Sequence, residues 1–121
     1  MATVSFEVPA SSDAPARARA SVRSIVGESE SADDILLATS ELVSNAVLHG
    51  NLTPQDRILV DVETADDGVR VTVSHDGRPF DHHADPPSDR PGGYGLQIVR
   101  AVSKRWDVTH HDGRTESWFE V

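Results

Sequence analysis

Residues 40–50 read SELVSNAVLHG, and this stretch organises the interpretation of the whole chain. Glu41, Asn45 and His49 follow one another at intervals of four residues. Four residues advance an α-helix by about one turn, so a carboxylate, an amide and an imidazole form one stripe. A helix that is apolar elsewhere is usually buried, and polar groups on it need partners. The apolar positions around the stripe are Leu42, Val43, Ala46, Val47 and Leu48.

Two interpretations of this stripe follow from spacing alone. In the first, the polar side chains bind a ligand that carries a metal or a phosphate. In the second, Asn45 hydrogen-bonds core backbone and Glu41 lies at a solvated edge, because polar pairs four residues apart are common on helices. The spacing leaves both interpretations open.

The hydrophobic periodicity on either side of this helix predicts an α+β fold. Alternating apolar residues indicate strands and apolar positions three or four residues apart indicate helices. The pattern favours a two-layer sandwich, a largely antiparallel mixed sheet with about three helices on one face, in a single domain over residues 1–121. The predicted elements are strand 3–8, helix 14–26, helix 32–49, a hairpin of strands 57–64 and 69–73, a helix from 96 to near 105, and a hairpin of strands 106–110 and 115–121.

Residues 76–93 read DGRPFDHHADPPSDRPGG, with four prolines and three glycines. Such a long loop in a compact domain is usually a functional lid or a disordered segment. Gly93 and Gly95 then precede a helix that begins near Leu96, where free backbone N–H groups and the helix dipole suit a phosphate. The alternative is a flexible hinge that enters a helix.

Composition narrows the function classes. The chain has 121 residues, no cysteine and a net charge of −9. These values exclude thiol chemistry and argue against nucleic acid as the main partner, although a nucleotide can still bind through local N–H groups and a metal. Neither a signal peptide nor a membrane span is recognisable, so we expect a cytoplasmic protein without a membrane partner. The six histidines lack metal-ligand spacing, which disfavours a transition-metal site.

Three segments together resemble the signature boxes of the GHKL ATPases, the superfamily that includes gyrase and the histidine kinases. ELVSNAVLHG at 41–50 resembles the N box, HDGRP at 75–79 lies where the first glycine box would be, and GGYGLQIV at 92–99 resembles the second glycine box. The ELxxNAxxHG form and the closing SWFEV at 117–121 are most similar to the anti-sigma factor serine kinase branch. The resemblance covers essentially the whole chain.

This resemblance implies a Bergerat fold in which ATP lies between the N-box helix, the sheet and a mobile lid. It implies that Asn45 is the Mg²⁺ ligand and that Glu41 is the general base. The other residues that it implies at the site are His49 near the phosphates, Gly93, Gly95 and Leu96 in the second glycine box, and Arg90 as a phosphate-stabilising arginine, with Arg78 as the second candidate.

The first glycine box departs from the family pattern. When Gly77 is aligned with the first glycine, His75 takes the place of the adenine-reading aspartate and Pro79 replaces the second glycine. A carboxylate accepts a hydrogen bond from the adenine amino group, whereas neutral imidazole accepts only through one nitrogen. A frame shifted to Asp76 would turn the reading side chain to the other face of the strand, so we favour His75. Adenine recognition is then expected to be weakened, water-mediated or lost.

The resemblance implies an ATP- and Mg²⁺-dependent protein serine kinase of the anti-sigma type. Such a kinase would bind a sigma factor and phosphorylate an anti-anti-sigma antagonist, and the branch makes a homodimer an expectation. A rival hypothesis is a degenerate, pseudokinase-like module that sequesters its partners without turnover, as His75 and Pro79 allow. ATP hydrolysis that drives a conformational change is a third hypothesis.

Overall fold

The computed structural model describes residues 2–77 and 95–121. Predicted loop residues from 78 onward lie outside this part, and so do Arg78, Arg90 and Gly93. The described elements, in chain order, are β1 (Ala2–Pro9), α1 (Ala14–Val26), α2 (Ala32–His49), β2 (Arg57–Ala65), β3 (Gly68–His75), α3 (Gly95–Val102), β4 (Arg105–His111) and β5 (Arg114–Glu120).

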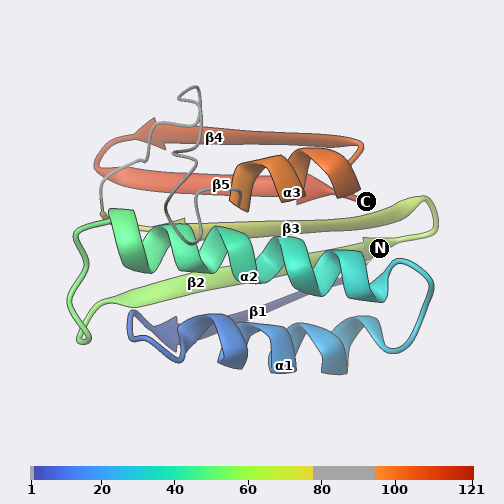
Figure 1. Ribbon diagram of the computed structural model, residues 1–121, viewed down its shortest axis with the longest axis horizontal. Helices are drawn as coiled ribbons and strands as arrows, with labels where there is room; N and C mark the ends of the chain where they lie inside the picture. The colour runs from blue at the N-terminus through green and yellow to red at the C-terminus, as the bar shows by residue number, and fades with distance from the viewer. Residues whose placement is uncertain (1, 78–94) are drawn as a thin grey trace.

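The five described strands form one sheet in the order β1-β2-β3-β5-β4, and every pairing is antiparallel. All three helices cover the same face of this sheet, and α2 lies between α1 and α3 (Figure 1). The predicted α+β sandwich of two layers is therefore confirmed. Strands that are close in sequence pair as the hairpins β2–β3 and β4–β5. The pairing of β3 with β5 joins these two hairpins into one sheet.

The core lies between the sheet and the helices. Alternate residues of the central strands point into it, as period two requires. The α2 side chains that meet them recur at helical spacing. The largest fully buried apolar members from these elements are Ile58, Val60 and Val62 of β2, Val71 and Val73 of β3, Phe119 of β5, and Ile35, Leu42 and Val43 of α2.

The opposite face of the sheet carries charged side chains instead of a second helical layer. Glu120 of β5 pairs with Arg70 at 3.3 Å on one side and with Arg105 at 2.7 Å on the other. The Arg70 guanidinium also lies 4.0 Å from the ring centroid of Trp118, which covers part of that aromatic surface. These interactions make the face compatible with water, so the described fold needs only two layers.

Two details differ from the sequence-based expectations. The helix α3 ends at Val102 and not near Arg105, because the Lys104 N–H donates to the Glu120 carbonyl and Arg105 already belongs to β4. Leu48, which the pattern placed on a buried helix, is 66% exposed. A helix that lies on one face of a sheet has an outer side, and Leu48 is on it. Within the described residues, no helix combines the length and apolar character needed to cross a membrane.

Candidate functional site

Asn45 has an unusual environment for a polar side chain on α2. It is only 7% exposed, yet its amide has no hydrogen-bond partner among residues 2–77 and 95–121. The hydroxyls of Thr39 and Ser40 on the same helix donate to the carbonyls of Ile35 and Leu37, at 2.7 and 3.2 Å. The interpretation in which Asn45 hydrogen-bonds core backbone therefore finds no support in the described residues.

The Asn45 amide also remains accessible from outside. In the described part of the chain, no side-chain nitrogen or oxygen that is completely shielded from solvent lacks a hydrogen bond. The unpaired amide atoms of Asn45 must then keep some contact with solvent. A largely buried amide that has no protein partner among the described residues suits a ligand, because a buried polar group without a partner costs free energy.

Glu41 lies one turn before Asn45 and is half-buried. Burial raises the pKa of its carboxyl group above the ordinary value. No described residue forms an ion pair or side-chain hydrogen bond with it. A carboxylate with a raised pKa and no partner is a competent proton acceptor. His49, one turn after Asn45, is exposed at the last residue of α2, so the stripe runs outward toward this end.

The end of α2 is in direct backbone contact with the end of β3. A Cβ added to Gly77 would lie 2.1 Å from the carbonyl oxygen of Gly50, so no other residue fits there without movement. A Cβ added to Gly50 would lie 3.1 Å from Cε1 of His75. The structure thus brings the N-box segment and the first glycine-box segment together, with the His75 ring beside Gly50.

The His75 ring is held in one tautomer. Its side chain is 3% exposed and shares the helix-covered face of β3 with Val73. The Gly77 N–H donates to its Nδ1 at 3.0 Å. Burial lowers the pKa of His75, and Arg114 and His110 act in the same direction against the opposing effect of Asp76. At neutral pH the ring is therefore uncharged and carries its proton on Nε2.

Asp76, the alternative reading position, turns to the other face of the sheet. Its side chain is exposed and its Oδ1 accepts a hydrogen bond from Arg114 Nη1 at 3.1 Å. The same guanidinium donates through Nη2 to the hydroxyl of Ser74 at 2.9 Å. This geometry agrees with the frame in which His75, and not Asp76, points between the sheet and the helices.

Thr115 of β5 supports this arrangement from the neighbouring strand. Its hydroxyl donates to the Gly77 carbonyl at 2.8 Å. Because that proton is used, Thr115 Oγ1 must accept the 2.8 Å hydrogen bond that it shares with Nδ1 of His110. Sequence reasoning missed Thr115, His110 and the contact role of Gly50. Only the pairing of His75 opposite Thr115 in the β3–β5 register reveals them.

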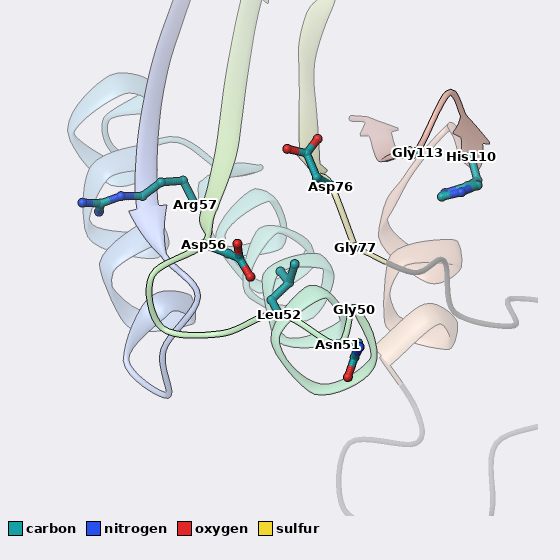
Figure 2. A pocket seen from close by; sticks show the side chains of 9 residues that line it. All are labelled: Gly50, Asn51, Leu52, Asp56, Arg57, Asp76, Gly77, His110 and Gly113. Atoms are coloured by element: carbon teal, nitrogen blue, oxygen red, sulfur yellow. The ribbon is translucent and has the colours of Figure 1, made fainter.

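A pocket of about 390 Å³ lies beside Gly77, where the segment after α2 meets the ends of β3 and the β4–β5 hairpin (Figure 2). It does not include Glu41 or Asn45. No group of three or more histidine, aspartate or glutamate side chains in the described residues could hold a metal ion. The residues that line the pocket are Gly50, Asn51, Leu52, Asp56, Arg57, Asp76, Gly77, His110 and Gly113.

The predicted second glycine box lies partly within the described chain. Gly95 is the first residue of α3 and Leu96 is the second, which agrees with the predicted helix start. Leu96 is half-buried against the core and Val99 is fully buried. The helix packs against α2, so its N-terminus belongs to the same layer as the Glu41–Asn45 stripe.

Comparisons with solved structures give the same fold. The RsbU and RsbW domains of Rv1364c from Mycobacterium tuberculosis match with a TM-score of 0.73 and 26% identity, over 99% of this chain and 32% of that chain. A blue-light activated histidine kinase, EL346 from Erythrobacter litoralis, matches with a TM-score of 0.59 and 21% identity, over 88% of this chain and 39% of that chain. The SiaB-SiaC complex from Pseudomonas aeruginosa matches with a TM-score of 0.55 and 14% identity, over 98% of this chain and 88% of that chain.

The present chain thus spans about a third of the length of the Rv1364c chain. A search of curated proteins finds no match. A family model described as the histidine kinase-like ATPase domain matches residues 8–120. Since this match covers nearly all of the sequence, the chain belongs to the histidine kinase-like ATPase domain family.

Proposed function

We propose that the chain binds Mg²⁺ and a nucleoside triphosphate, and that it acts as a protein serine kinase of the anti-sigma type. The resemblance to the family implies that this nucleotide is ATP. The observation that carries this proposal is the environment of the Asn45 side chain. It is only 7% exposed, its amide keeps some contact with solvent, and it has no partner among the described residues. An amide oxygen is a hard ligand of the kind that Mg²⁺ prefers. Phosphate oxygens and water would complete the octahedral shell, because Mg²⁺ usually takes only one or two ligands from protein.

Glu41 is the proposed general base. Its raised pKa and its lack of a protein partner favour proton acceptance from a serine hydroxyl of the substrate protein. The serine oxygen then forms a bond to the γ-phosphorus while the bond from that phosphorus to the β–γ bridging oxygen breaks. The proton passes to Glu41 and the nucleoside diphosphate leaves. When bound, Mg²⁺ would neutralise charge on the phosphates.

The remaining predicted residues take supporting roles in this proposal. Gly95 and Leu96 begin α3, where the first backbone N–H groups of a helix have no intrahelical partner and can donate to phosphate oxygens. His49, exposed at the end of α2, is proposed to lie near the phosphates. His75 is proposed to lie beside the purine base of the nucleotide. Arg90 and Gly93 are proposed as parts of a lid and lie outside the described residues.

The proposed protein partners are a sigma factor and an anti-anti-sigma antagonist. The similarity to a chain that contains an RsbW domain supports this assignment. The net charge of −9 suits a basic surface on a partner and disfavours direct nucleic-acid binding. A cytoplasmic location and a homodimer are parts of the same proposal.

Nucleotide titration by calorimetry, with and without Mg²⁺, tests the proposal. Metal-dependent binding is expected for the native protein and for Ser44→Ala, a control on the same helix. Asn45→Ala should lose the binding, whereas Glu41→Ala should keep it and lose phosphotransfer to a serine substrate. Unchanged nucleotide affinity in Asn45→Ala would sink the Mg²⁺ assignment, and full phosphotransfer by Glu41→Ala would sink the base assignment.

The second candidate function is a module that sequesters its partners without turnover. One observation favours this alternative. The side chain proposed to contact the purine base of the nucleotide is the imidazole of His75 and not a carboxylate. In that case the native protein would bind its partner protein with equal affinity in the presence and absence of nucleotide. A partner affinity that changes when nucleotide and Mg²⁺ are added would exclude this alternative.

A further inference from the structure

The His75 ring presents a hydrogen-bond donor that no described residue uses. Its Nδ1 is occupied by the Gly77 N–H, so the ring proton lies on Nε2. No described residue accepts a hydrogen bond from Nε2, although the side chain is only 3% exposed. Because no completely shielded polar side-chain atom of the described chain is unpaired, Nε2 keeps some contact with solvent.

The surrounding hydrogen bonds prevent the ring from offering an acceptor instead. A flipped ring would direct a C–H at the Gly77 N–H and leave that partly buried donor without its partner, which costs free energy. The Gly77 peptide is held in turn, since its carbonyl accepts the hydroxyl proton of Thr115 at 2.8 Å. Nδ1 of His110 donates to the same Thr115 oxygen. The donor and the acceptor of each hydrogen bond that links His75, Gly77, Thr115 and His110 are therefore determined.

Asp76, the next residue, supplies no acceptor in place of His75. Asp76 lies on the other face of the sheet and pairs with Arg114. Gly50, which lies beside the ring, has no side chain. Within the described surroundings, the imidazole therefore offers a donor to any ligand that reaches it.

This property selects among nucleotides if, as proposed above, a nucleotide binds with its base at His75. We infer that the preferred base is a 6-oxopurine, guanine or hypoxanthine, and not adenine. A 6-oxopurine presents the acceptor O6 to the Nε2–H, whereas adenine presents the amino donor N6 at the same position. Two donors that face each other in a buried site leave both unpaired.

The test is a set of calorimetric titrations of the native protein with ITP, GTP and ATP, each with Mg²⁺. ITP should bind about 10-fold to 100-fold more tightly than ATP, because ATP leaves the Nε2–H donor of His75 unpaired. ITP lacks the 2-amino group, so comparison with GTP distinguishes hypoxanthine from guanine. His75→Asp replaces the donor with an acceptor and should reverse the order in favour of ATP. Asp76→Asn, at the neighbouring exposed position, is the matched control and should keep the native order.

The outcomes separate this inference from the proposed function. ATP affinity equal to or above that of ITP, with binding still dependent on Asn45, overturns the 6-oxopurine inference and leaves the proposed function standing. Absence of binding to all three nucleotides overturns both. If His75→Asp does not fold, ¹⁵N NMR of the native protein provides a second test, since a proton on Nδ1 of His75 would overturn the inference directly.

Discussion

Two buried polar regions of this molecule differ in how their hydrogen-bonding groups are satisfied. At the end of β3, His75 and Gly77 are tied to Thr115 through a continuous set of hydrogen bonds. In the middle of α2, Glu41 and Asn45 have no side-chain partner among the described residues. Both regions are polar and at least half-buried, so burial alone does not distinguish them. They differ in how many of their groups have a protein partner, because Nε2 of His75 is the one group of the first set that lacks a partner among the described residues.

The difference has a thermodynamic meaning. A satisfied buried network rigidifies the fold, whereas an unpaired buried group destabilises it until a ligand arrives. Substitutions should therefore have opposite effects on folding stability in the two regions.

Gly77→Ala should produce the largest loss of stability. The added Cβ would lie 2.1 Å from the backbone oxygen of Gly50, and backbone has little room to move. A loss of about 2–3 kcal/mol in the free energy of unfolding is expected from such overpacking, measured by urea denaturation. Gly113→Ala is the control, because its Cβ meets nothing within 4 Å and only its φ of 76° is strained. Equal losses in the two variants would contradict the contact between the two segments.

Thr115→Val should lower the free energy of unfolding by about 1 kcal/mol, because it leaves the partly buried Gly77 carbonyl without its partner. Thr115→Ser keeps the hydroxyl and should retain most of the stability. Thr39→Val is the contrasting case, since its hydroxyl bonds only a carbonyl of its own helix. A Thr115→Val variant as stable as Thr39→Val would show that the network contributes nothing.

Asn45→Leu should raise stability by about 1 kcal/mol, because it removes an unpaired buried amide and keeps a side chain of similar size. Thermal denaturation without nucleotide measures this gain. The same variant should lose Mg²⁺-dependent nucleotide binding. A loss of stability greater than about 1 kcal/mol would mean that the Asn45 side chain stabilises the fold, as the hydrogen bonds around His75 and Gly77 do.

The two regions should also respond oppositely to pH, and this effect is expected to be the smallest. The folded-state pKa of His75 is lowered by burial, so its contribution to stability is present above the unfolded value of 6.5 and is lost as the pH falls toward the folded value. The folded-state pKa of Glu41 is raised, so its contribution is present at acid pH and is lost as the pH rises through that value. Stability measured from pH 7 to 5 should fall less steeply in His75→Gln than in the native protein. Parallel curves for the two proteins would contradict the assignment for His75.

Local patterns in the sequence predicted most of the fold. The alternation from Ile58 to Val73 specified a hairpin, because each buried residue and its period are encoded within a few neighbours. The helix 32–49 was predicted with the bounds that the structure has. The predicted end of the third helix was too late, since a hydrogen bond from Lys104 to the distant Glu120 decides where β4 begins.

The spacing of Glu41, Asn45 and His49 is enough to place them on one stripe, since helical geometry depends only on spacing. Tertiary structure alone decided which of these groups lack partners and which way the His75 proton points. Those properties arise from the contact of Gly50 with Gly77 and from the pairing of β3 with β5, where Thr115 reaches Gly77 across 38 residues of chain. Contacts over such separations depend on how the elements pack together, and no short stretch of sequence encodes that packing.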